Sequence, residues 1–123
     1  MTARFSLLAA LLAASPALAL AQEQTNRPED GAFISQVVFT CERGTQVPVA
    51  YVLIPTGESF AVAHIDGQQI AMIQVVSGSG VRYRSVDEAH PYELHAKGDD
   101  GMFFYGPDGD AADLLTECRV SET

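Results

Sequence analysis

The sequence predicts a small all-β domain, folded as an antiparallel barrel or a sandwich. Three observations support this fold class. Short apolar or alternating runs follow one another at close spacing, and the breaks between them carry turn-forming residues. Beyond residue 21, no segment keeps a 3.6-residue apolar period over ten or more residues. We favour the barrel over the sandwich because closure removes exposed strand edges.

The first 21 residues are typical of a secretory signal. Arg4 supplies the positive start, residues 5–14 are apolar, and Ala-Leu-Ala at 19–21 provides the small residues of a cleavage site. The apolar run is short for a membrane span, and no cysteine stands at the cleavage site to carry a lipid. We therefore expect residues 1–21 to be removed and the rest of the chain to be exported without a membrane anchor.

The exported part is expected to form one domain. Residues 22–34 are mostly polar, which predicts a flexible N-terminal arm, and residues 35–123 form the barrel domain. Eight strands are predicted in this domain, at 35–41, 46–54, 59–65, 69–76, 81–86, 91–97, 102–105 and 113–119. Asp66-Gly67 is the strongest hairpin signal between them, and the other turns are predicted at 56–57, 77–80, 98–101 and 107–109.

The two cysteines of the chain, Cys41 and Cys118, fall in the first and last predicted strands. In an oxidising compartment they are expected to form a disulfide bond. Such a bond would close almost the whole domain, which chain-entropy models equate with about 4–5 kcal/mol of stability.

The charge of the chain is strongly negative. The net charge is −9, and loss of Arg4 with the signal leaves 6 basic and 16 acidic side chains, hence −10. Nucleic acids and anionic lipid surfaces are therefore poor partners. A cationic protein is a better one, because complementary charge steers encounter.

The stretch SGSGVRY at 77–83 is the first candidate for chemistry. Gly78 and Gly80 flank Ser79 and give the backbone freedom on both sides of a hydroxyl. A glycine-rich hairpin turn with incidental serines is the simpler interpretation. A catalytic serine would need a positioned base, and SGSG does not match the nucleophile elbow of hydrolases. An enzyme is therefore not expected.

The histidines and Lys97 complete the list of candidates. His64, His90 and His95 lack metal-binding spacing, so neither a metal nor another cofactor is predicted. Lys97 is the only lysine, and it ends a predicted strand just before the turn at Gly98. It is either a solvated strand-end residue or a cation placed to meet a carboxylate.

Together these residues resemble a known family, the periplasmic and membrane-bound inhibitors of c-type lysozyme. The resemblance spans most of residues 37–119. The matching residues are Phe39-x-Cys41, the motif Ser77-Gly78-Ser79-Gly80-x-x-Tyr83, Lys97-Gly98 with its acidic neighbours, and Cys118.

The resemblance implies an eight-stranded antiparallel barrel with one disulfide bond. It also implies a soluble periplasmic inhibitor of c-type lysozyme. Separately, we expect the chain to be a monomer or a weak dimer. By this resemblance, the loop that bears Ser79 would enter the lysozyme cleft, Lys97 would meet the catalytic carboxylates, and Tyr83 would support the loop. The lysozyme-binding residues would be Ser77, Gly78, Ser79, Gly80, Arg82, Tyr83, Lys97 and Gly98.

The chain departs from the family pattern before Lys97. An aromatic pair is usual there, and Leu94-His95 stands in its place. The segment between Tyr83 and Lys97 is also longer, with DEAHPY at 87–92 inserted. The alternative to an inhibitor is a periplasmic β-barrel that binds a glycan fragment or another envelope protein.

Overall fold

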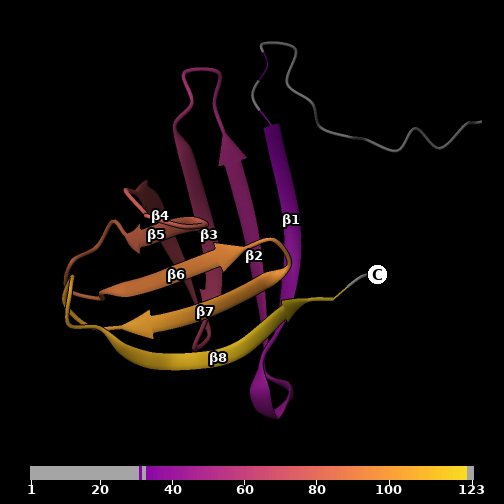
Figure 1. Cartoon of the computed structure of the whole chain (residues 1–123), viewed down its shortest axis with the longest axis vertical. Helices are drawn as coiled ribbons and strands as arrows, with labels where there is room; N and C mark the ends of the chain where they lie inside the picture. The colour runs from indigo at the N-terminus through magenta and orange to yellow at the C-terminus, as the bar shows by residue number, and fades with distance from the viewer. Residues whose placement is uncertain (1–30, 32, 122–123) are drawn as a thin grey trace, which may run out of the picture.

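The computed structural model describes residue 31 and residues 33–121. The signal sequence predicted at 1–21 and most of the predicted arm lie outside these residues. The described part consists of eight strands and one short 3₁₀ turn (Figure 1). They are β1 (Phe33–Thr40), η1 (Glu42–Gly44), β2 (Gln46–Leu53), β3 (Ser59–Ile65), β4 (Gln68–Val75), β5 (Val81–Ser85), β6 (Tyr92–Lys97), β7 (Asp100–Tyr105) and β8 (Ala112–Val120).

The strands form a closed antiparallel barrel in which each strand pairs with its neighbours in sequence. β1 and β8 close it through only two residue pairs, Phe39 with Val120 and Thr40 with Arg119. In Figure 1, β6 to β8 cross β1 to β3 at a steep angle, as expected for strongly twisted strands. The predicted eight-stranded barrel is confirmed, and the sandwich is excluded.

The barrel interior is filled by alternate residues of the strands, as the two-residue period of a strand requires. Phe39 and Phe103 meet edge to face near its centre, with ring centroids 5.8 Å apart. Leu94 and Ala63 are fully enclosed. Burying one large apolar side chain contributes about 1.5–3 kcal/mol, so this interior is the main source of stability. Among residues 33–121, no helix is long and apolar enough to cross a bilayer.

The ends of every strand except β3 differ from the prediction by one or two residues. β1 begins at Phe33, so Phe33 and Ile34 belong to the sheet and not to the arm. Their apolar side chains pair with Leu53 and Val52 of β2, which extends the hairpin. β1 also ends at Thr40, before the predicted residue 41, and β8 begins one residue early.

The turn predicted at 98–101 is shorter than expected. It contains two residues, Gly98 and Asp99, and β7 starts at Asp100. Gly98 has a φ of 58°, which lets the chain reverse in two residues. Gly101 serves packing instead, because a Cβ at this position would lie 2.7 Å from the ring of Phe39.

The predicted disulfide bond joins Cys41 and Cys118, 77 residues apart. Cys41 follows directly after β1, and Cys118 lies in β8 opposite Gly101. Both cysteines are buried. The bond therefore strengthens the closure of the barrel between β1 and β8, which share fewer residue pairs than any other two neighbouring strands.

Candidate functional site

The serine-glycine motif forms the loop between β4 and β5. Ser77 Oγ donates a hydrogen bond to the backbone oxygen of Ser79 at 2.7 Å. This bond ties the loop to itself across Gly78. The side chain of Ser79 stays exposed at the tip, so a hydroxyl is presented to solvent on a locally braced backbone.

Gly80 brings this loop against the end of β6. Its φ is 65°, and a Cβ placed on it would lie 2.5 Å from the backbone oxygen of Ala96 and 3.1 Å from Cβ of Lys97. Only glycine fits such a close approach in this conformation. The two halves of the sequence motif, which are 17 residues apart, therefore touch at Gly80 and Lys97.

Ser79 and Lys97 line one surface hollow of about 630 Å³ over β6, β7 and β8. In the same hollow, Arg119 is paired with Asp100 at 3.2 Å. Among residues 33–121, Lys97 has no acidic partner within 4.0 Å. Its ammonium group is therefore available to a carboxylate from another molecule.

The other two candidate residues point in opposite directions from β5. Tyr83 faces the interior, is 4% exposed, and shares a 2.7 Å hydrogen bond with Ser59. Its ring also lies against Tyr51, with centroids 5.6 Å apart. Tyr83 can support the strand from inside, but it offers almost no surface to a partner.

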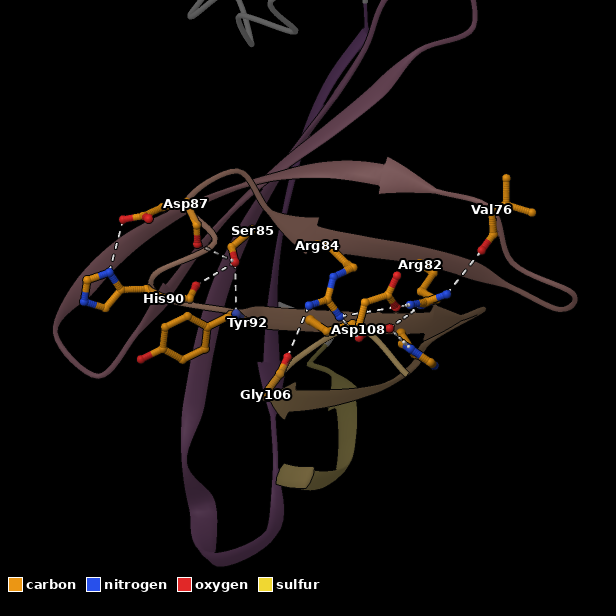
Figure 2. Close-up of polar contacts among 11 residues, drawn as sticks. Val76, Arg82, Arg84, Ser85, Asp87, His90, Tyr92, Gly106 and Asp108 are labelled. Carbon is orange, nitrogen blue, oxygen red and sulfur yellow. Dashed lines mark hydrogen bonds and ion pairs between the residues drawn. The ribbon is translucent and has the colours of Figure 1, made fainter. Parts of the chain in front are cut away.

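Arg82 faces outward, beside Asp108 (Figure 2). It belongs to a network of ion pairs centred on Glu93. Glu93 is buried and accepts hydrogen bonds from Arg82, Arg84 and His95. Arg82 also pairs with Asp108 at 2.6 Å, and Arg84 donates to the backbone oxygen of Gly106 at 3.2 Å. The network thus joins β5, β6 and the β7–β8 loop.

The network holds Glu93 ionised. Burial alone would raise the pKa of Glu93, but hydrogen bonds from Arg82 and His95 and the charges of Arg82 and Arg84 outweigh burial and lower it. The hydrogen bond to Glu93 likewise raises the pKa of Arg82. Arg82 additionally reaches the backbone oxygen of Val76 at 3.5 Å, at the start of the serine loop.

His95 and Ser79 line the same hollow, yet His95 is not bonded to the serine in the described residues. Its Nε2 lies 2.6 Å from Oε1 of Glu93, and its ring packs against Phe104 in a tilted arrangement with centroids 4.7 Å apart. No hydrogen bond joins His95 to Ser79 in the described part of the chain. A nucleophile without a bonded base is a poor catalyst, so the surface is suited to binding.

The inserted segment 87–92 lies at the far end of the β5–β6 pair from Lys97, as Figure 2 shows for Asp87 and His90 relative to Val76 and Arg82. It is held by its own contacts. Asp87 accepts from the backbone of Ala89 at 2.9 Å, and Ser85 donates to the backbone oxygen of His90 at 2.6 Å. The longer segment therefore leaves the pairing of Val81 with Ala96 intact, and with it the position of Lys97.

The Glu93 network was not predicted from the sequence. A signal was present, because Arg-x-Arg on one predicted strand and Glu-x-His on the next place opposite charges on matching alternate positions. The observed register pairs Arg84 with Glu93 and Arg82 with His95.

These features define a small, disulfide-closed barrel that presents the side chains of Ser79 and Lys97 at one hollow. Within residues 33–121, Lys97 has no acidic partner and Ser79 has no bonded histidine, an arrangement typical of a binding protein. The family model described as membrane-bound lysozyme-inhibitor of c-type lysozyme matches residues 39–112. The chain belongs to this family, whose members are inhibitors and not enzymes.

A solved structure agrees with this assignment. The periplasmic lysozyme inhibitor of C-type lysozyme from Salmonella typhimurium is 26% identical to the chain, with a TM-score of 0.65. The match covers 72% of this chain and 99% of that one. A search of curated proteins found no match.

Proposed function

We propose that the chain is exported to the periplasm and inhibits c-type lysozyme by placing the loop at 77–83 and Lys97 in the catalytic cleft. The observation that carries this proposal is the contact of Gly80 with the end of β6. Because of it, the hydroxyl of Ser79 and the ammonium of Lys97 line the same hollow. Family membership and the structure of the Salmonella inhibitor support the same function.

The chemistry of the target fits these two groups. A lysozyme works through two carboxyl groups that flank the scissile bond in an open groove. A hydroxyl can donate a hydrogen bond to one carboxylate, and an ammonium can pair with the other. The net charge of −9 would also attract a cationic partner.

The remaining candidate residues have distinct proposed roles. Ser77 and Gly80 fix the shape of the loop, and Gly78 lets its backbone approach the cleft wall. Gly98 lets the chain turn directly after Lys97. Tyr83 and Arg82 support the loop from inside and outside the barrel.

Clearing of a cell-wall suspension by a c-type lysozyme tests the proposal. Ser79→Ala is expected to weaken binding by about 1.5–3 kcal/mol if the hydroxyl meets an ionised carboxylate. Lys97→Ala is expected to cost on the order of 2–5 kcal/mol if the pair is desolvated. Arg43→Ala is the control, because it removes one exposed positive charge from the β1–β2 hairpin. The proposed function fails if micromolar wild-type chain does not slow clearing.

A further inference from the structure

Val76 is the most exposed large apolar side chain among residues 33–121. It is 91% exposed, and Val86 follows with 64%. Valine is one of the side chains that proteins most often bury. A single exposed apolar side chain is common on protein surfaces, so the exposure of Val76 carries weight only together with its position and its contacts.

Val76 lies at the entrance to the serine loop. β4 ends at Val75, and Val76 connects this strand to Ser77, the first residue of the motif. Val76, Ser77 and Gly78 line the same surface hollow of about 430 Å³. A molecule that surrounds the loop must therefore come close to the methyl groups of Val76.

The backbone of Val76 is held by the Glu93 network. Nη1 of Arg82 donates to the backbone oxygen of Val76 at 3.5 Å, and Arg82 is itself paired with Glu93 and Asp108. Figure 2 shows the carbonyl of Val76 directed toward Arg82 and its methyl groups directed away from it. The apolar side chain is thus positioned before a partner arrives, which lowers the entropy that binding costs.

Other apolar groups lie beside Val76. The rings of His95 and Phe104 line the same hollow and lie against each other with centroids 4.7 Å apart. Val76 also lines a second hollow together with Ile73, which is 44% exposed. The side chain of Val76 therefore belongs to an apolar surface next to the loop.

We propose that Val76 is an apolar contact residue for c-type lysozyme, an inference that rests on the proposed function. When the loop at 77–83 enters the catalytic cleft, the methyl groups of Val76 pack against the apolar wall of the cleft. Clefts that bind ligands are lined mainly by hydrophobic and aromatic side chains, with few polar groups. Ser79 and Lys97 are complementary to the carboxyl groups of the cleft, and Val76 is complementary to its wall.

The position of Val76 favours lysozyme over other occupants. One valine buries too little surface to hold a partner alone, so it contributes to binding only as part of a larger interface. The interface that adjoins Val76 is the loop with the exposed hydroxyl of Ser79. An anionic lipid surface would be repelled by the net charge of −9.

Titration of lysozyme activity with the wild-type chain and with Val76→Thr tests the proposal. Threonine keeps the branched shape of valine and replaces one methyl group with a hydroxyl. The inhibition constant should rise roughly 10-fold, because an apolar contact is lost and a hydroxyl loses its water. The Tm should be unchanged, because Val76 is exposed in the free chain.

Val86→Thr is the matched control. It makes the same change at the other highly exposed valine, which follows β5 at the far end of the β5–β6 pair from the serine loop. Both the inhibition constant and the Tm should stay at their wild-type values.

Ionic strength separates this contact from the charged ones. The loss from Val76→Thr should be the same at about 0.05 M and about 0.5 M salt, whereas the loss from Lys97→Ala should shrink as salt screens the ion pair. A Val76→Thr variant that inhibits as well as the wild type, or a loss that disappears at high salt, overturns the proposal while the proposed function stands. A wild type that does not inhibit at all overturns both.

Discussion

Replacement of Gly80 by alanine tests the contact on which the proposed site depends. A Cβ at this position would lie 2.5 Å from the backbone oxygen of Ala96, a separation that side chains do not adopt, so either the loop or the end of β6 must move. The left-handed backbone costs an alanine about 1–2 kcal/mol. Overpacking adds about 1–3 kcal/mol.

The expected destabilisation of Gly80→Ala is therefore about 2–5 kcal/mol, which corresponds to a fall in Tm of roughly 10–40 °C for a domain of this size. Moving Ser79 away from Lys97 should also lose one charge-assisted contact with the target. Inhibition should weaken by about 10–100-fold. Urea denaturation gives the first quantity, and titration of lysozyme activity gives the second.

Gly67→Ala is the matched control. Gly67 has a φ of 73°, close to that of Gly80, but no atom lies within 4 Å of its Cβ position in the β3–β4 turn. Gly67→Ala should therefore lose only the stability that a left-handed backbone costs an alanine, about 1–2 kcal/mol. Inhibition of lysozyme should be unchanged. If both variants lose the same stability and inhibit equally well, the contact of Gly80 with β6 does not position the site.

Three further predictions concern the groups that support the site. The pKa of Glu93 in the folded protein lies below its usual value near 4.5. The ionised side chain therefore adds its full contribution to the free energy of unfolding above the pKa of the unfolded chain. That contribution is lost as the pH falls through the pKa of the folded protein. Glu93→Gln should cost about 2–4 kcal/mol at pH 7. In urea titrations at several pH values, the variant should also lose less stability than the wild type as the pH falls. An unchanged pH dependence would contradict the role of Glu93 as an ionised partner of the two arginines. Reduction of the Cys41–Cys118 bond should cost about 4–5 kcal/mol, and a loss under 1 kcal/mol would argue against its role at the barrel seam. Tyr83→Phe leaves the Ser59 hydroxyl unpaired and should cost about 1–2 kcal/mol with inhibition unchanged, whereas a large loss of inhibition would mean that the Tyr83 hydroxyl contacts lysozyme.

Much of the fold could be predicted from local sequence features. Asp66-Gly67 forms the expected two-residue hairpin, and both residues have positive φ. The eight strands follow from alternation and turn chemistry, which act over a few residues. Local features do not decide between barrel and sandwich, because that choice depends on the pairing of β1 with β8, two strands at opposite ends of the domain.

The site was predictable only in part. The motifs indicated Ser79 and Lys97 separately, but their shared hollow depends on the register of Val81 against Ala96 and on the packing of Gly80. Burial of Glu93 could not be predicted either. It lies at an outward position and becomes buried because Arg82 and Arg84 from a neighbouring strand cover it.

Binding of the chain to lysozyme in the presence of a cleft-filling oligosaccharide tests the central claim most directly. Calorimetric titration of a c-type lysozyme would be carried out with and without a saturating N-acetylglucosamine oligomer. Blocking of the cleft by the loop at 77–83 and by Lys97 predicts that the apparent dissociation constant rises in proportion to the oligomer concentration. Unchanged affinity for oligomer-saturated lysozyme would show that the chain binds elsewhere on the enzyme.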